Sequence, residues 1–398
     1  MEKRTDWMLV GLLVASGIVA AFHVGKMPPA LPSIRGDLGA TLRQGGWLLS
    51  IINLTTAVGG MAIALTADRF GHRRLVLIGT AICFLASLPG AFASNVTQLL
   101  ASRFVEGLGF IAITVSAPPL LLRLAAPADA HRAMSLWTAY MPAGAGTMMF
   151  ASALILPHAS WRVVWLVAAT ASAVMLLALL FRTPPAQRGE PTATGMRSLW
   201  HDMRVVATSG GPLATALCFA AYSSCWYAIV GFLPTLQIER LKMDASAAAI
   251  VTALVTFVNV GGNLVAGALL GRGVPRVALI VGAAIPMAFC AGGIFFDGVP
   301  DILRLILAGV YSAVIGVVPG ALFTAIPVHA PRPQLVGAAT GLLMQGSNVG
   351  ALLGPPVTAV LVSSGGWPAA VWLTSTALAV VAASGAFLHR RERRRLAA

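Results

Sequence analysis

Few ionisable residues lie inside the long apolar segments of this chain. Of its 13 acidic residues only Glu106 lies well within such a segment, and the basic residues found there are Lys26, Arg103 and Arg304. A charged side chain at the centre of a bilayer costs about 2.5 to 3.5 kcal/mol on insertion scales. Each of these four residues therefore needs a partner or a function.

The spacing of these residues predicts one cluster. Arg103 and Glu106 are three residues apart, as are His23 and Lys26, so each pair shares a helix face. Lys26 lies eight residues before the expected end of its segment at position 34, and Glu106 lies eight residues after the expected start of its own at position 98. At about 1.5 Å per residue, both are about 12 Å below the same surface. We expect the two pairs to meet there.

Composition identifies the surroundings of these residues as a membrane. Hydrophobic residues make up 58% of the 398 positions, charged residues make up 10%, and the mean hydropathy is +0.84. Such values exclude a soluble globular enzyme. The net charge of +14 then indicates arginines that contact anionic lipids at the cytoplasmic face, rather than a protein that binds nucleic acid.

Apolar runs between charged or Pro/Gly-rich breaks predict an all-α membrane protein with about twelve transmembrane helices of about 20 to 25 residues. The first six fall near residues 7–34, 46–66, 75–94, 98–122, 133–156 and 163–181. The second six fall near residues 209–235, 247–270, 277–296, 302–326, 338–362 and 368–388. This leaves no room for a separate soluble domain.

The distribution of basic residues predicts the orientation. With the N-terminus inside, 19 of the 27 Lys and Arg residues fall on the cytoplasmic side, 5 on the opposite side and 3 within spans. This is the bias that the positive-inside rule describes. We expect a multi-pass protein of a bacterial inner membrane with both termini in the cytoplasm. A hydrophilic stretch divides the chain into an N-terminal half (1–181), a cytoplasmic linker (182–204) and a C-terminal half (205–398) with a short basic tail.

The two halves carry traces of a duplication. A shift of 202 residues aligns the glycine pair 59–60 with 261–262, and it aligns segment 71–74 with 273–276, which also begins with Gly and ends with Arg. Shared Gly and Arg positions at one fixed offset indicate a repeated six-helix unit. Two parallel halves predict a binding site near the bilayer midplane at their interface, exposed to each side in turn as the halves rock.

Two motifs resemble those of the major facilitator superfamily. Between the second and third predicted spans lies Asp68-Arg69-Phe-Gly-His72-Arg73-Arg74, which is similar to the family's Asp-Arg-x-Gly-Arg-Arg loop with a histidine in place of its first paired arginine. The fourth span contains Arg-Phe-Val-Glu-Gly-Leu-Gly at 103–109, similar to the family's Arg-x-x-x-Gly-x-Gly motif. The resemblance covers the whole chain. It implies two pseudo-symmetric six-helix halves and a secondary transporter, usually a monomer.

The resemblance also implies a role for the loop. Asp68 can pair with neighbouring arginines or with the positive N-terminus of a helix from the other half. Such contacts, made by Asp68, Arg69, Arg73 and Arg74, would latch the cytoplasmic side while the transporter is open outward. The alternative is that these charges only set the topology.

The cluster around Glu106 allows two interpretations. In the first, Glu106 neutralises Arg103 while Lys26 extends toward the surface, and the network is structural. In the second, one acid leaves two permanent cations with a surplus positive charge that faces the cavity, and an anionic substrate completes it. Protonation of Glu106 or His23 would then couple transport to a proton gradient. Arg304 extends toward the surface or pairs with Asp301, and we interpret it as structural.

The ionisable residues within the apolar segments also indicate the class of substrate. An exporter of cationic drugs typically needs a cavity acid in the N-terminal half, whereas the first span offers Lys26. The run from Lys26 to Gly39 resembles the end of the first helix in the cyanate and nitroimidazole transporter group. We therefore predict a proton-coupled transporter of a small, anionic or polar organic solute. A proton-coupled drug exporter or a solute exchanger is the alternative, and the chain offers no set of residues for enzyme catalysis.

Polar residues within the spans are candidates for the substrate site. A tyrosine hydroxyl or a side-chain amide inside a bilayer needs a partner, either a substrate in an aqueous cavity or a neighbouring helix. The candidates, besides His23 and Lys26, are Asn53, Tyr140, Tyr222, Tyr227, Asn259, Tyr311, Gln345 and Asn348. We expect no metal site and no cofactor, because the four cysteines lie in apolar segments without metal-ligand spacing.

Overall fold

The structure of the protein is a computed structural model. It describes residues 5–59, 71–126, 129, 133, 136–137, 139–182, 196–332 and 335–396. All regular secondary structure within these ranges is helical.

A helix occupies each of the twelve predicted spans. The first six contain α1 (Trp7–Gly25) with α2 (Met27–Leu38), α3 (Leu42–Ser50) with η1 (Ile51–Asn53) and a helical stretch at 54–59, α5 (His72–Ala91), α6 (Val96–Leu124), α8 (Tyr140–Ile155) and α9 (Trp161–Arg182). The second six contain α11 (Gly210–Glu239), α12 (Ala245–Gly271), α13 (Arg276–Phe295), α14 (Asp301–Ile315) with α15 (Val317–His329), α16 (Val336–Gly365), and η4 (Trp367–Ala369) with α17 (Ala370–Leu396).

Ten of these helical segments are long and apolar enough to cross a membrane within the part of the chain that the structure describes. The other two predicted spans, 46–66 and 133–156, run partly through residues outside it. The chain is thus an all-α membrane protein.

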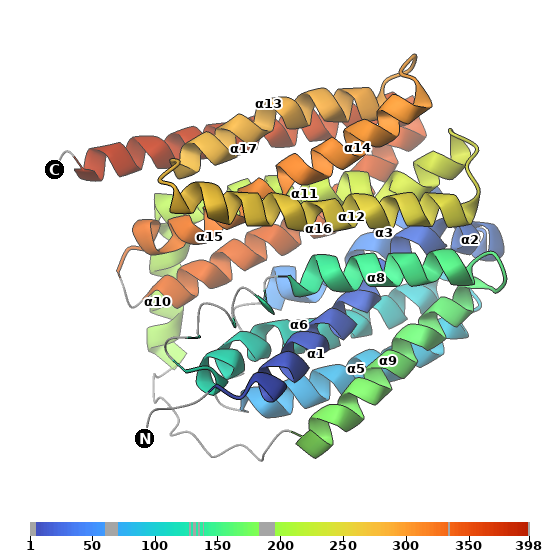
Figure 1. Ribbon diagram of the computed structural model, residues 1–398, viewed down its shortest axis with the longest axis horizontal. Helices are drawn as coiled ribbons and strands as arrows, with labels where there is room; N and C mark the ends of the chain where they lie inside the picture. The colour runs from blue at the N-terminus through green and yellow to red at the C-terminus, as the bar shows by residue number, and fades with distance from the viewer. Residues whose placement is uncertain are drawn as a thin grey trace.

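The helices form two bundles that meet along one interface, which we call the seam. In the first bundle α5 packs against α6 and α9, and α1 packs against α8; in the second, α11 packs against α16 and α17. Across the seam α8 packs against α12, α3 against α16, and α2 against α11. Figure 1 shows both chain ends at the same end of the molecule. We call this end the terminal face and the opposite end the distal face.

Prolines divide two of the spans. Pro28 and Pro29 follow the junction of α1 and α2, and Pro319 follows the junction of α14 and α15 at Gly316. A proline lacks an N–H and clashes with the preceding helical turn, so it kinks a helix at such a point. Lys26 lies at the first of these kinks, between the last residue of α1 and the first of α2.

One helix was not expected. The linker predicted over 182–204 contains the start of α10 (Met196–Thr208), which lies at the terminal face (Figure 1). Val206 in this helix is buried in the core of the C-terminal half, because α10 packs against α11 and α16. Apolar residues at 196, 199, 203 and 206 follow the spacing of an amphipathic helix, so the sequence did carry the signal.

Glycines let α16 approach α11 closely. A Cβ added to Gly350 would lie 1.9 Å from the carbonyl oxygen of Ala220, and Gly346 and Gly354 meet α11 carbonyls in the same way at 2.2 and 2.6 Å. Small residues at four-residue spacing are the usual means of close helix packing in membranes. These three positions therefore fix the distance between the two helices.

The seam is closed near the distal face. The guanidinium of Arg35 at the end of α2 forms an ion pair with Glu239 at the end of α11. The hydroxyl of Ser246 in α12 donates to the backbone oxygen of Ala153 in α8 at 2.8 Å. Toward the terminal face, Figure 1 shows the ribbons of the two halves spreading apart. This is a conformation in which the distal side of the seam is shut.

Arg304 is structural, although its partners differ from those expected. It is 2% exposed and does not extend to the surface. Its guanidinium donates to the backbone oxygens of Ile294, Phe296 and Val299, at and just beyond the C-terminal end of α13. These carbonyls have no intrahelical donor, and a cation at a helix C-terminus also interacts favourably with the helix dipole.

Candidate functional site

The kink between α1 and α2 brings Lys26 against α6. Its Nζ lies 2.5 Å from Glu106 Oε1 and donates to Ser87 Oγ of α5 at 2.8 Å. The same nitrogen lies 4.4 Å from the centre of the Trp165 ring of α9, a cation–π distance. Lys26 and Glu106 are both 0% exposed.

Arg103 binds the other side of the same carboxylate. Its Nη1 lies 2.7 Å from Glu106 Oε2 and also donates to the backbone oxygen of His23, while Nε donates to the backbone oxygen of Leu48 at 3.3 Å. Its Nη2 is buried and has no hydrogen-bond partner among the described residues. Among the residues that the structure describes, Arg103 thus keeps one donor nitrogen, Nη2, unpaired.

His23 closes the cluster on the side of α9. Its Nδ1 lies 3.3 Å from Glu106 Oε1, and its Nε2 lies 2.8 Å from Ser172 Oγ. With a neutral imidazole, the charge cluster of His23, Lys26, Arg103 and Glu106 holds two cations and one anion. Its net charge is then positive by one.

The predicted meeting of the two pairs is confirmed. Lys26 does not extend to the surface, because its ammonium is enclosed between α1, α5, α6 and α9. Sequence reasoning missed Ser87, Trp165 and Ser172, which complete the cluster. Single serines and tryptophans in apolar spans carry no sign of which helices will be neighbours, so their contribution could not have been found.

Three of the predicted tyrosines come together at the seam. The hydroxyls of Tyr140 of α8 and Tyr227 of α11 are close enough to interact electrostatically, and Tyr227 interacts in the same way with Tyr222 and with Arg103. Tyr140 and Tyr227 also pack against a common apolar cluster of the N-terminal half that includes Ile52. Arg103 therefore stands at one end of a polar group that crosses from one half to the other.

Asn259 continues this polar group within the C-terminal half. Its side chain interacts with Tyr222, and its Nδ2 donates to the backbone oxygen of Ser312 in α14 at 3.1 Å. One turn further along α12, Asn263 Nδ2 donates to Asn259 Oδ1 at 3.0 Å. The set of Arg103, Tyr140, Tyr222, Tyr227 and Asn259 is the candidate site, which we call the seam site.

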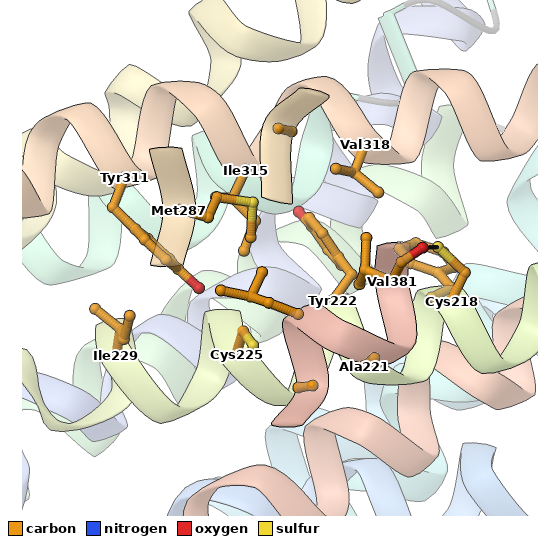
Figure 2. Close-up of a cluster of buried hydrophobic side chains, with 14 of the residues drawn as sticks. Cys218, Ala221, Tyr222, Cys225, Ile229, Met287, Tyr311, Ile315, Val318 and Val381 are labelled. Atoms are coloured by element: carbon orange, nitrogen blue, oxygen red, sulfur yellow. Dashed lines mark hydrogen bonds between the residues drawn. The ribbon is translucent and has the colours of Figure 1, made fainter. Parts of the chain in front are cut away.

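Tyr311 lies in the apolar core that also contains Tyr222. It is 0% exposed within the core of the C-terminal half. Figure 2 shows its hydroxyl pointing toward α11 near Cys225, with Met287 alongside. Tyr222 belongs to the same core and interacts electrostatically with Tyr311, so Tyr311 is linked to the seam tyrosines through Tyr222.

The remaining predicted lining residues make local contacts. Asn53 is buried in η1 and donates to the backbone oxygen of Ser50 at 3.3 Å. Asn348 of α16 donates to the backbone oxygen of Met344 at 2.8 Å, and Gln345 is half-buried on the same helix. The hydrogen bonds of Asn53 and Asn348 each stay within one helical turn.

The predicted gating loop lies partly outside the described residues, which exclude Asp68 and Arg69. Arg73 and Arg74 lie in the first turn of α5, where Arg73 is half-buried and Arg74 is exposed. In the second half Arg276, which the repeat aligns with Arg74, lies 3.5 Å from Glu392 of α17.

Comparison with known proteins identifies the family of this chain. The sequence profile described as Major Facilitator Superfamily matches residues 12–344. The chain belongs to the Major Facilitator Superfamily. The family assignment agrees with the loop and helix motifs from which the resemblance was drawn.

Relatives within the Major Facilitator Superfamily include carriers of organic solutes. The chain is 25% identical to the 3-(3-hydroxy-phenyl)propionate transporter of Escherichia coli K12, covering 96% of this chain and 90% of the relative. It is 23% identical to the probable sulfoacetate transporter SauU of Cupriavidus necator, with 97% and 94% covered. It is 28% identical to the methyl viologen resistance protein SmvA of Salmonella typhimurium, but only 46% of this chain and 37% of that protein are covered.

Solved structures show the same fold. The xylose transporter XylE from E. coli in an inward open conformation matches with a TM-score of 0.76 at 12% identity, covering 96% of this chain and 95% of that one. A bacterial homolog of the human lysosomal transporter Spinster, inward-facing and unoccupied, matches with a TM-score of 0.75 at 17% identity, covering 95% and 94%. The predicted fold class is confirmed, and so is the prediction of a membrane transporter rather than an enzyme.

Proposed function

We propose that this protein is a proton-coupled secondary transporter that moves a small organic anion by alternating access. The observation that carries the proposal is the charge balance around Glu106. Among the described residues it is the one acidic side chain that is fully buried, and it is held by two cations. The surplus charge is positive, which favours an anion.

The seam site supplies the contacts for such an anion. The free Nη2 of Arg103 is a buried cationic donor beside Tyr227, and charge-assisted hydrogen bonds to a carboxylate are stronger than neutral ones. Tyr140, Tyr222 and Asn259 offer neutral donors from both sides of the seam. The names of two relatives that match along nearly their whole length refer to organic acids, hydroxyphenylpropionate and sulfoacetate, which supports this class of substrate.

The charge cluster also offers a route for coupling. A proton on Glu106 would neutralise the carboxylate that links Lys26 at the α1–α2 kink to α6, and His23 is within reach to exchange a proton with it. Removing that charge weakens two ion pairs at once and frees Arg103 to bind an anion more strongly. Protonation and anion binding would then favour one another.

The bias of basic residues assigns the terminal face to the cytoplasm. With the distal side of the seam shut, the conformation described here is the inward-facing one. Asp68, Arg69, Arg73 and Arg74 would then form their latch in the opposite, outward-open state. Anionic lipid headgroups would contact the basic residues of this face.

Proteoliposomes test the proposal. We expect an inward proton gradient to drive uptake of (3-hydroxyphenyl)propionate, sulfoacetate or another small carboxylate by the wild type. Glu106→Gln should abolish the response to the pH gradient, and Lys26→Ala should abolish uptake, while Arg272→Ala, an exposed residue at the end of α12, should leave it unchanged. Anion uptake that ignores the pH gradient would refute proton coupling.

A drug exporter is the second candidate, favoured by the partial similarity to SmvA. Methyl viologen is a cation, and the surplus positive charge of the cluster opposes its binding. The same proteoliposomes loaded with methyl viologen decide between the two. Proton-driven efflux of methyl viologen that survives Lys26→Ala would replace the anion proposal with the drug-exporter one.

A further inference from the structure

A second group of polar side chains lies on the distal side of the seam site. In this group Thr252 Oγ1 of α12 lies 3.2 Å from Gln237 Oε1 at the end of α11, and Thr256 lies one turn below Thr252. Gln237 and Thr252 are 0% exposed and Thr256 is 2% exposed. We call these three residues the distal corner.

The distal corner is closed by the N-terminal half. Thr256 Oγ1 lies 3.4 Å from Met149 Sδ of α8, a weak acceptor. Six residues before Thr252 on α12, toward the distal face, the hydroxyl of Ser246 donates to the backbone oxygen of Ala153, also in α8. The polar face of α12 is therefore sealed by α8 in this conformation.

The amide of Gln237 is not satisfied in the sealed state. Its Nε2 is buried and has no hydrogen-bond partner among the described residues. In either orientation of the Gln237 amide, Thr252 pairs with only one of the two polar atoms of that amide. A buried, unmade hydrogen bond is costly and calls for an explanation. If the two halves separate at the distal face, that donor and the Thr252 and Thr256 hydroxyls become open to solute.

We propose that Gln237, Thr252 and Thr256 form a second substrate subsite, open when the distal side of the seam opens and sealed when it closes. The subsite has neutral donors and no cation, so it suits the carboxylate or hydroxyl oxygens of an organic acid and holds them weakly. Its two threonines lie on the same helix as Asn259 and Asn263, which continue the polar face of α12 toward the terminal face. The subsite receives solute from the distal side before the seam site does. This inference rests on the proposed function.

Labelling of a cysteine tests whether the corner opens. Thr252→Cys in purified protein should react slowly with a membrane-impermeant maleimide. Arg35→Gln removes an exposed cross-seam ion pair, so the reaction should become about two- to five-fold faster. Ala291 is equally buried but is packed inside the C-terminal half, so Arg35→Gln should not change the labelling rate of Ala291→Cys. The four native cysteines are buried and serve as an internal background. The proposal would be overturned if cysteines at positions 252 and 291 reacted with the maleimide at equal rates, both with and without Arg35→Gln.

Transport from each side tests whether the corner binds solute. With (3-hydroxyphenyl)propionate as the probe, Gln237→Leu should raise the half-saturation concentration on the distal side about three- to ten-fold, the effect of one lost hydrogen bond. The half-saturation concentration on the terminal side should stay within about two-fold of the wild-type value. Thr252→Val should follow Gln237→Leu, whereas Thr252→Ser keeps the hydroxyl and should behave as wild type.

The possible failures are distinguishable. Equal effects on both sides, or none on either, would overturn the subsite while leaving the transporter proposal intact. A wild type that carries neither (3-hydroxyphenyl)propionate nor sulfoacetate would overturn the proposed substrate class and with it the ligand of the subsite. The labelling rates would still show whether the corner opens, because they require no substrate.

Discussion

Lys26 Nζ lies 2.5 Å from Glu106 Oε1, and neither side chain is exposed. The contact joins the kink between α1 and α2 to the middle of α6, and Arg103 holds the second oxygen of the same carboxylate. A buried ion pair that loses one partner leaves an uncompensated charge, which costs about 3 to 5 kcal/mol. The order of stability among variants of this cluster follows from that cost.

Glu106→Gln should destabilise the protein more than Lys26→Met. The first change leaves Lys26 and Arg103 as two buried cations without an anion, whereas the second leaves Arg103 and Glu106 as an intact pair. The double variant should recover stability relative to Glu106→Gln alone, since one of the two cations is gone. Thermal unfolding of the purified protein in detergent measures the series.

The double variant is also the control for this cycle. Side chains that act independently would give additive effects, so that the double variant is the least stable of the three. That result would contradict the pairing seen in the structure.

Tyr227→Phe and Tyr311→Phe should differ in transport. Tyr227 lies at the seam beside Arg103, whereas Tyr311 is enclosed in the core of the C-terminal half (Figure 2). Loss of a hydroxyl that contacts substrate should raise the half-saturation concentration for (3-hydroxyphenyl)propionate about three- to ten-fold. The same loss at position 311 should leave it unchanged. Equal effects of the two variants would show that Tyr227 has no special place in the site.

Arg304→Ala should lower stability without altering substrate affinity. The change removes three hydrogen bonds to carbonyls around the end of α13, and hydrogen bonds to charged groups contribute about 1.5 to 3 kcal/mol each. Arg304→Lys should recover part of the loss, since an ammonium can reach fewer of the carbonyls. Thermal unfolding measures the stability. A matching loss on Arg272→Ala, at an exposed arginine, would show that charge alone is responsible.

Gly350→Ala should destabilise the C-terminal half, and Gly267→Ala should not. A Cβ at position 350 would lie 1.9 Å from the backbone oxygen of Ala220, whereas nothing lies within 4 Å of a Cβ at position 267. Overpacking costs about 1 to 3 kcal/mol, while alanine at an open helical position favours the helix by about 1 kcal/mol. Thermal midpoints that move in opposite directions would confirm the contact between α11 and α16, and equal midpoints would contradict it.

The sequence predicted the spans because apolar length is a local property. A helix must satisfy its own backbone hydrogen bonds in a bilayer, so each apolar run long enough to cross it forms a helix. The same locality explains the meeting of Lys26 and Glu106, since depth can be counted along each helix from its end. Bends were harder to predict, although the prolines at 28, 29 and 319 lie at the α1–α2 and α14–α15 kinks.

What the sequence by itself determined was the fold class, the family and the presence of a positively charged cluster around one acid. The tertiary structure alone decided which helices are neighbours. It placed Ser87, Trp165 and Ser172 around the cluster, gathered Tyr140, Tyr222 and Tyr227 at the seam, and moved Tyr311 into the core. It also revealed that Gln237 Nε2 is buried with no hydrogen-bond partner in the described part of the chain. Packing depends on the shapes of surfaces from distant parts of the chain, which neither spacing nor composition records.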